Sequence, residues 1–254
     1  MDSQPVVDFE KKMADVPTVP ASSFGDSMVI APHADDETLG CGGTAALLLR
    51  EGFTVQFVFV SDGTLSHPNS KKYPAPRLRV LRELEAIHAV EILGGKKENV
   101  DFLSLPDRNV PHADSLYFES VVRLMMACIR QHQPQTIFIP WQNDPHPDHR
   151  ASFQILTEAV LRLDVKPRIL QYPIWLWEMG NVRDIELISK MQICGVDIRN
   201  VLEIKRKALD AHQSQITDLI DDDPDGFRLS EEMIAHFSNA REIFFENERT
   251  IFDG

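Results

Sequence analysis

The sequence predicts an α/β protein with a mostly parallel sheet of about five or more strands and helices on both faces. Three observations support this fold class. Short apolar runs alternate with segments of helical periodicity, which is typical of βαβ units. Histidines and acids follow directly after two of the apolar runs, and functional groups gather at the carboxyl ends of strands in open parallel sheets. The 254 residues, with 43% hydrophobic content, suffice for one large α/β domain or two small ones.

Strands and helices are expected to alternate from residue 27 to about residue 175. Five apolar, β-branched or aromatic runs predict strands at residues 27–32, 54–63, 99–107, 135–141 and 168–175. Helical spacing between them predicts helices at residues 38–52, 76–95, 114–134 and 148–163. Further on, we expect a short strand at 194–198, a long helix at 200–220 and a last helix at 230–248. Residues 1–26 are weakly periodic and predict an arm or loop, followed by a single domain at 27–254.

The net charge and the cysteine spacing exclude several classes of function. The chain carries 39 acids against 26 bases, and its formal charge of −13 would repel nucleic acid and anionic membranes. Its three cysteines are scattered without a C-x-x-C pair, so neither a disulfide framework nor a cysteine-based zinc site is indicated. No signal-peptide pattern and no apolar run near the ~20 residues of a membrane span occur. We therefore expect a cytoplasmic protein.

The stretch VIAPHADDETLGCGG, from Val29 to Gly43, places a histidine and three consecutive acids at the end of an apolar strand. Removing adjacent carboxylates from water is costly unless a cation meets them. Helix capping by Asp35 or Asp36 is one explanation. A dinucleotide site fits poorly, because the glycines do not follow G-x-G-x-x-G and the acids would repel a pyrophosphate. The third explanation is a divalent metal held by His33 and a nearby Asp. This stretch alone does not decide between helix capping and metal binding.

A second cluster of the same kind follows the fourth predicted strand. In PWQNDPHPDHRASF, His146, Asp148 and His149 stand just before a helix. In a doubly wound sheet the two turns open at the same edge, so we expect the clusters to meet. A catalytic zinc takes about three protein ligands and keeps one position for water. The two clusters supply three ligands and leave acid–base groups over, which favours a metal-dependent enzyme.

Together, APHADDETLGCGG and PHPDH resemble the signatures (A/P)-H-P-D-D-E and P-H-x-D-H of the PIG-L/LmbE family of zinc-dependent N-acetylglucosaminyl de-N-acetylases. LRELEAIHAVEILG, FLSLPDRNV and KRKALDAHQSQ are similar to other motifs of that family. The resemblance covers about residues 27–250 and implies a Rossmann-like LmbE fold. One departure is Ala34, where the family usually has a proline that stiffens the turn. Since every ligand is kept, we expect the metal site to survive with a slightly looser loop.

The resemblance implies a role for each residue of the two clusters. Zinc, with iron(II) as the alternative, would be bound by three residues, His33, Asp36 and His149. Asp35 would be the general base that takes a proton from the attacking water and passes it to the leaving amine. His146, in its protonated form, would stabilise the tetrahedral oxyanion, and Asp148 would hold His146 charged and oriented. The reaction would hydrolyse an acetamide to acetate and a free amine.

The substrate implied by the resemblance is an N-acetylated amino sugar of the N-acetylglucosamine type, free or as a glycoconjugate. The candidate substrate contacts are Arg82, Trp141, Asn143, Asp62 and His212. An ion pair with Glu83 or Glu85 is the structural alternative for Arg82, and core packing is expected for at least one of the three tryptophans. A metal-dependent amidase acting on a thiol conjugate or another non-sugar amide is the alternative enzyme. The oligomeric state stays open, a homo-oligomer included.

Residues 221–232, DDDPDGFRLSEE, match the calcium-loop pattern D-x-D-x-D-G-x5-E, so a calcium-binding module is the rival from another class. Pro224 stiffens this loop, Arg228 takes a position that is normally apolar, and Leu229 stands where an oxygen ligand is usual. No second loop is present to pair with it. We therefore expect an acidic surface loop that breaks a helix at Pro224 and restarts one near Ser230.

Overall fold

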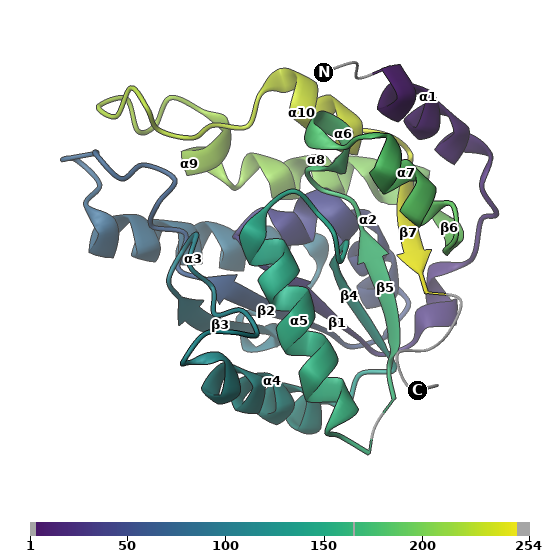
Figure 1. The fold of residues 1–254 in the computed structure, drawn as a ribbon. Coiled ribbons are helices and arrows are strands. Elements are labelled where there is room, and N and C mark those ends of the chain that lie inside the picture. The colour runs from purple at the N-terminus through teal and green to yellow at the C-terminus, as the bar shows by residue number, and fades with distance from the viewer. Residues whose placement is uncertain (1–3, 165, 248–254) are drawn as a thin grey trace.

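One seven-stranded sheet runs through the protein, with the strand order β3-β2-β1-β4-β5-β7-β6 (Figure 1). The computed structural model describes residues 4–164 and 166–247. Its strands are β1 (Ser27–Ala31), β2 (Val55–Ser61), β3 (Val100–Leu105), β4 (Thr136–Pro140), β5 (Arg168–Tyr172), β6 (Gln192–Asp197) and β7 (Arg241–Glu246). The first five strands pair in parallel, and β7 runs antiparallel to β5 and β6. The predicted α/β class with a mostly parallel sheet is confirmed.

The central strands form where the sequence is continuously apolar. Every residue of β1, β2 and β4 is buried, as parallel strands with both faces covered require. In the register of the sheet, Val29 of β1 lies between Phe57 of β2 and Phe138 of β4. The chain order therefore reverses between β1 and β4, and open α/β sheets bind ligands beyond the carboxyl ends of the strands at such a point.

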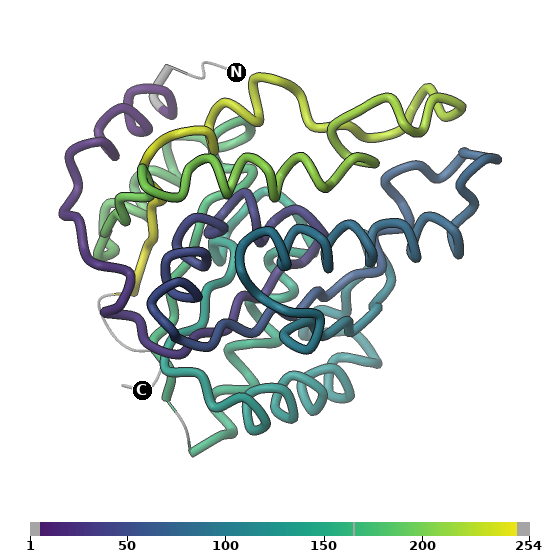
Figure 2. The backbone as a smooth tube through the Cα atoms, turned by 180° about the vertical axis from the view of Figure 1, so that it is seen from behind, coloured from purple at the N-terminus to yellow at the C-terminus, as the bar shows by residue number. Residues whose placement is uncertain are grey.

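Two groups of helices cover the two faces of the sheet (Figures 1 and 2). Helices α4 (Phe118–His132) and α5 (Pro147–Leu161) pack on one face, while α2 (Asp36–Arg50), α3 (Ala75–Leu93) and α8 (Leu202–Asp210) cover the other. Four further helices are short, namely α6 (Leu176–Met179), α7 (Val182–Ile188), α9 (Gln213–Ile216) and α10 (Glu231–Phe237). Within the described residues, none of the helices has the length and apolar character needed to cross a membrane.

The N-terminal segment differs from the expected arm or loop, because it contains helix α1 (Gln4–Lys12) and two short 3₁₀ turns. Val6, Phe9 and Met13 recur at helical spacing and are buried. The ring of Phe9 lies 6.4 Å from that of Trp177 in α6. Two helical turns are marginal in isolation, so packing of this apolar stripe stabilises the helix where sequence periodicity alone is too short to predict it.

Two predictions for the C-terminal part are wrong in detail. The helix expected at 200–220 ends at Asp210, and the single turn α9 follows His212. The helix expected at 230–248 ends at Phe237, and β7 begins at Arg241. β7 fills the gap between β5 and β6, where its backbone groups pair on both sides and its aromatic residues are buried. Sheet pairing and burial outweigh the weak helical pattern here.

Helix α2 carries Asp36 in its first turn and is kinked at Cys41, whose φ of −148° is not helical. Buried Glu242 of β7 accepts hydrogen bonds of 2.7 Å from two backbone N–H groups past the kink, those of Gly43 and Thr44. Buried Lys205 of α8 donates to the Leu39 carbonyl (2.8 Å) and to Glu242 (2.7 Å). The Lys205–Glu242 pair therefore satisfies the groups that the kink frees and fixes the first turn of α2.

Candidate metal centre

Both His–Asp clusters lie at the switch point of the sheet, because one follows β1 and the other follows its neighbour β4. The ring centroids of His33 and His149 are 5.4 Å apart, and those of His33 and His146 are 4.6 Å apart. Residues more than a hundred positions apart in the chain therefore meet, as the sequence predicts.

Three donor atoms converge at the centre of this cluster. Asp36 Oδ2 lies 3.2 Å from His149 Nε2 and 3.4 Å from His33 Nδ1, and the two nitrogens are 3.3 Å apart. A tetrahedral ion with bonds of ~2.0–2.1 Å needs ligand atoms about 3.3 Å apart. The triangle fits a zinc-sized divalent ion, and two histidines with one carboxylate also form a donor set for non-haem iron(II). His33, Asp36 and His149 could therefore hold such a metal.

The triangle lies in a strongly anionic environment. Burial alone would lower the pKa of His149, but the carboxylates of Asp36 and Asp144 raise it to about 9. Burial also opposes the charged form of His33, yet its pKa is held well above the ordinary value by three carboxylates, those of Asp107, Asp148 and Asp36. The two histidines in turn keep the pKa of Asp36 low despite its burial. This excess of negative charge favours a bound cation.

Asp144 orients His149 from the far side of the ring. Its Oδ1 lies 3.1 Å from His149 Nδ1, and the same carboxylate accepts hydrogen bonds from the backbone N–H groups of His146 (2.9 Å) and Trp175 (3.0 Å). Carboxylates in this position fix the tautomer and orientation of a metal-binding histidine. The sequence does not single out Asp144, although it stands inside the second cluster, because an Asp before Pro is also typical of a turn.

Asp107 and Asp148 hold His33 in the same way. His33 Nε2 lies 3.4 Å from Asp107 and 3.2 Å from Asp148. The Asp148 carboxylate also accepts hydrogen bonds from two backbone N–H groups of the loop after β3, those of Arg108 (2.7 Å) and Val110 (3.2 Å). Both oxygens of this carboxylate are thus engaged by His33 and by the loop after β3, and its interaction with His146 is electrostatic, without a hydrogen bond between the two side chains.

His146 is arranged to donate a hydrogen bond in its neutral form. Its Nδ1 accepts the backbone N–H of Asp148 at 3.2 Å, which leaves the ring proton on Nε2. Burial, together with His33 and His149, lowers the pKa of His146 to about 4. The ring stacks at 6.5 Å on that of Trp175. Both features favour a neutral imidazole, whereas the family resemblance implies a protonated one.

Asp35 is held beside the triangle in a strained turn, with a φ of +136° that side chains rarely adopt. Glu37 accepts its backbone N–H at 2.9 Å. Arg82 donates to the Ala34 carbonyl at 2.8 Å and lies 3.6 Å from Asp35 Oδ2, so it supports the turn where the proline is missing. Burial raises the pKa of Asp35 to about 7, against the opposing effect of Arg82. A carboxyl group with such a pKa is suited to accept and return a proton.

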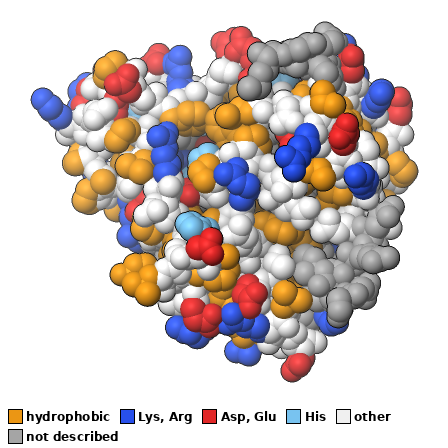
Figure 3. All heavy atoms as spheres, in the orientation of Figure 1, with side chains coloured by type: hydrophobic (Ala, Val, Ile, Leu, Met, Phe, Trp, Pro, Cys, Tyr) orange, Lys and Arg blue, Asp and Glu red, His pale blue; other side chains and the backbone are white. Residues whose placement is uncertain are grey.

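A cavity of about 350 Å³ opens over this centre. Its polar part carries His33, Asp35, Asp36 and His146, whereas Asp148 and His149 are buried and do not line it. Its other part, the apolar wall, consists of Leu39, Leu65, Pro145, Pro147, Ile174, Trp175, Met179, Phe227, Leu229 and Met233. On the face shown in Figure 3, hydrophobic, acidic and basic side chains are intermixed without a broad field of one charge. The cavity combines acid–base groups, candidate metal ligands and an apolar surface, which is typical of a small-molecule site.

Among the five predicted substrate contacts, Arg82 is the one that lines this cavity. It is buried and donates to the backbone, so neither predicted glutamate is its partner. Trp141 is fully buried in the core, and Asn143 is exposed outside the cavity. Of the other two tryptophans, Trp175 belongs to the apolar wall.

Asp62 and His212 support the centre from a distance. Asp62 accepts a hydrogen bond from the backbone N–H of Asp107 at 3.3 Å and so orients the loop after β3. His212 is fully buried and lies 2.8 Å from Glu37, the residue that accepts the Asp35 N–H. His212 therefore lies beneath the site rather than at its rim. Glu37 and Asp107 are functional residues that the sequence does not single out, although both stand in motifs shared with the PIG-L/LmbE family.

Two loops, residues 62–74 and 217–230, project from the protein side by side (Figures 1 and 2). The acidic stretch at 221–232 begins in the second loop and binds the first through hydrogen bonds. Asp222 accepts the Ser70 hydroxyl at 2.6 Å and the backbone N–H groups of residues 71 and 72. Asp223 accepts the Asn69 N–H at 2.8 Å. This geometry fits the acidic surface loop, although the preceding helix breaks before Pro224. The restart is confirmed, since the Ser230 hydroxyl caps α10.

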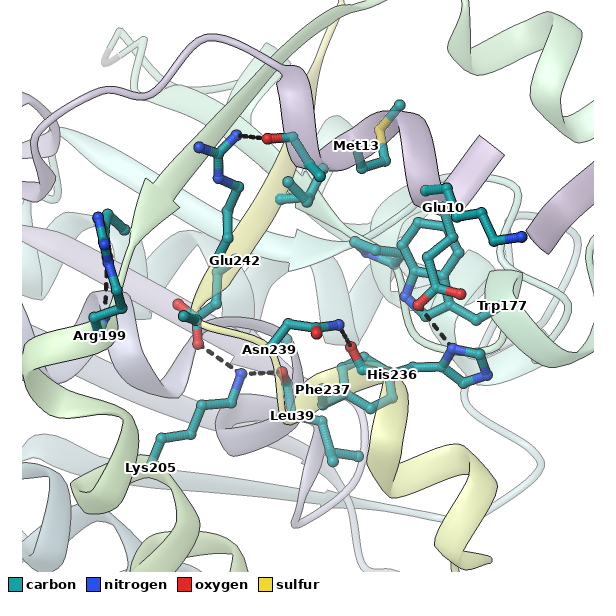
Figure 4. Close-up of a pocket in the computed structure, with 18 of the residues that line it drawn as sticks. Glu10, Met13, Leu39, Trp177, Arg199, Lys205, His236, Phe237, Asn239 and Glu242 are labelled. Carbon is teal, nitrogen blue, oxygen red and sulfur yellow. Dashed lines mark hydrogen bonds and ion pairs between the residues drawn. The ribbon is translucent and has the colours of Figure 1, made fainter. Parts of the chain in front are cut away.

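A larger cavity of about 600 Å³ lies among α1, α10 and β7 (Figure 4). Several of its charged side chains pair with one another, among them Lys205 with Glu242, and His236 with Glu10 at 2.8 Å. Within the described residues, the groups that could hold a metal lie at the smaller cavity and all include His33. The smaller cavity is therefore the candidate site.

Two relatives of this chain are named as deacetylases. The diacetylchitobiose deacetylase of Thermococcus kodakarensis is 27% identical over 206 residues, which cover 74% of this chain and 69% of the relative. A probable N-acetyl-alpha-D-glucosaminyl L-malate deacetylase 2 of Bacillus cereus is 27% identical over 199 residues, covering 77% of this chain and 86% of the relative.

Solved structures with different activities share the fold. The N,N'-diacetylchitobiose deacetylase of Pyrococcus horikoshii superposes with a TM-score of 0.63 at 24% identity, covering 84% of this chain and 80% of the other. GalB, a 4-carboxy-2-hydroxymuconate hydratase from Pseudomonas putida, superposes with a TM-score of 0.57 at 21% identity. The match covers 74% of this chain and 78% of GalB. The fold therefore does not fix the reaction, which has to be argued from the site.

The sequence matches the family described as PIG-L: GlcNAc-PI de-N-acetylase over residues 28–160, just over half of the chain. This range contains both His–Asp clusters and the loop after β3 that bears Asp107. The chain belongs to the PIG-L de-N-acetylase family.

Proposed function

We propose that this protein is a zinc-dependent deacetylase, with iron(II) as the alternative metal, that hydrolyses the acetamido group of an N-acetylated amino sugar. The observation that carries this proposal is the triangle of His33, Asp36 and His149, whose donor atoms are 3.2–3.4 Å apart beside Asp35. The names of the two relatives, a chitobiose and a glucosaminyl malate deacetylase, support the substrate class.

In this proposal each residue of the centre has a defined task. A metal held by the triangle would polarise the acetamide carbonyl and lower the pKa of a water molecule. Asp35 would take the proton of the attacking water and later give it to the leaving amine. His146 would donate its Nε2 hydrogen to the developing oxyanion. Asp144 and Asp148 would keep the rings of the two ligand histidines in place.

An amine-release screen tests the proposal. The substrates are N-acetylglucosamine, diacetylchitobiose, N-acetylglucosaminides with different aglycones, and non-sugar N-acetyl compounds, each with and without a chelator. We expect release from acetylated amino sugars that a chelator abolishes and added zinc or iron(II) restores. Hydrolysis confined to non-sugar compounds would favour the amidase, and release that persists after complete metal removal would contradict the proposed chemistry.

A further inference from the structure

Two arginines line the cavity, and they differ in how they are engaged. Arg82 is buried and bonded to the Gly63 and Ala34 carbonyls beside Asp35. Arg108 is exposed at the cavity, and among the described residues its guanidinium has no hydrogen-bond or ion-pair partner. Arg108 is thus the cationic side chain of the cavity lining that is free to meet a ligand.

The backbone conformation at position 108 is unfavourable for arginine. Pro106 accepts the backbone N–H of Asn109 at 3.1 Å, which closes a turn, and Arg108 stands at its third position with a φ of +56°. Glycine or asparagine is favoured at such a position. The Arg108 N–H donates to Asp148 at 2.7 Å, but any residue other than proline could make this bond. The turn therefore does not explain why position 108 is an arginine, whereas a role of its side chain in the cavity does.

The surroundings of Arg108 indicate what it could bind. Two neighbouring carboxylates already face His33: that of Asp107, the preceding residue, and that of Asp148, which accepts the Arg108 N–H. The apolar wall offers no other cation, and the protein as a whole carries a charge of −13. An anionic substrate would be repelled by this protein unless a local cation met it. The guanidinium fork matches both carboxylate and phosphate.

We propose that Arg108 binds an anionic group, a carboxylate or a phosphate, on the part of the substrate beyond the acetamido sugar. This inference rests on the proposed deacetylase function and adds to it that the preferred substrates are anionic glycoconjugates. Arg108 lies outside the reacting groups, so its contact contributes equally to the ground state and the transition state. Its loss is expected to raise KM and to leave kcat unchanged.

The test uses Arg108→Asn in the full-length, metal-loaded chain, because asparagine suits the positive φ and does not perturb the turn. The probes are the carboxymethyl glycoside of N-acetylglucosamine, its uncharged carboxamide, and N-acetylglucosamine 1-phosphate. We expect KM for the preferred anionic probe to rise about tenfold or more, kcat and the carboxamide KM to stay unchanged, and Tm to be equal or higher. Arg108→Lys should retain part of the preference for the charged probe.

Arg228→Asn is the matched control, since Arg228 is exposed, pairs with Asp218 and lies outside the cavity lining. It should leave every KM unchanged. An Arg108→Asn variant with unaltered kinetics, or with equal losses on charged and uncharged probes, would overturn the inference. Calorimetric binding of the three probes separates this result from failure of the proposed function. If the chain hydrolyses none of them, a charge preference in binding that Arg108→Asn removes still supports the role of Arg108, and its absence contradicts it.

Discussion

Asp144 Oδ1 lies 3.1 Å from His149 Nδ1, while Asp36 Oδ2 lies 3.2 Å from the other nitrogen of the same ring. His149 is therefore held between two carboxylates in the fully buried part of the site. Asp144 also fixes the turn before α5 through the His146 N–H. A single side chain thus links the backbone of the second cluster to the orientation of a candidate metal ligand.

Asp144→Asn should weaken metal binding by about 10–100-fold, because an amide no longer fixes the tautomer of His149 as a carboxylate does. The measurement is a zinc titration against a competing chelator. Asn143→Ala is the control, since Asn143 is exposed beside Asp144, and its affinity should be unchanged. Equal affinities of Asp144→Asn and the parent protein would show that Asp144 does not orient His149.

Asp35→Asn should retain the metal and lose turnover by about 10²–10⁴-fold, the usual contribution of a general base. The amide cannot accept the proton of the attacking water, whereas the three candidate ligands are untouched. Metal content and kcat are measured on the same preparation. A fully active Asp35→Asn variant would mean that another group is the base.

Lys205→Met should destabilise the fold by roughly 3–5 kcal/mol, because it leaves Glu242 charged and buried without its partner. Urea unfolding measures the change in the free energy of unfolding. Arg199→Ala is the control, because Arg199 lines the same larger cavity as Lys205 but its side chain is exposed. Its free energy of unfolding should not change measurably. A small effect of Lys205→Met would indicate that the kink of α2 does not depend on this pair.

The contacts of His236 predict that the docking of α1 depends on pH. It lies 2.8 Å from Glu10 of α1 and 3.1 Å from Glu178 of α6, and these contacts, chiefly the one to Glu10, raise its pKa. A raised histidine pKa stabilises the fold fully below the unfolded value of about 6.5, and the contribution is lost as the pH rises through the folded pKa.

The stability difference between the parent protein and His236→Gln should therefore be largest below about pH 6.5 and shrink as the pH rises. Thermal unfolding over a pH series measures it. His88→Gln, on the exposed face of α3, is the matched control. A difference that is constant with pH would contradict the proposed ion pairs.

The sequence predicted the parts of the fold that depend on local patterns of apolar residues. Five strands and the helices between them follow from continuous apolar runs and helical spacing. The strand β7 could not be predicted in this way, since Arg241–Glu246 forms a strand only because β5 and β6 leave a gap for it. The turns of α1 likewise depend on the apolar contacts of Phe9 with the body of the protein.

For the candidate site, the sequence predicted which residues meet but not every partner. His33 and His149 come together because their strands are neighbours. The actual partner of Asp148 was missed, since the loop that bears Arg108 comes from β3 and its reach depends on tertiary structure. Trp141 and His212, predicted as substrate contacts, are buried outside the cavity lining, and burial cannot be read from residue type alone.

The metal content of the purified chain, compared with that of His149→Ala, tests the central claim most directly. We predict close to one equivalent of zinc or iron(II) per parent chain by elemental analysis, with anaerobic preparation for iron. His149→Ala should stay folded by circular dichroism and lose most of the metal, since one corner of the 3.2–3.4 Å triangle is removed. A parent chain that carries no metal after supply of both ions, or an undiminished content in His149→Ala, would contradict the account.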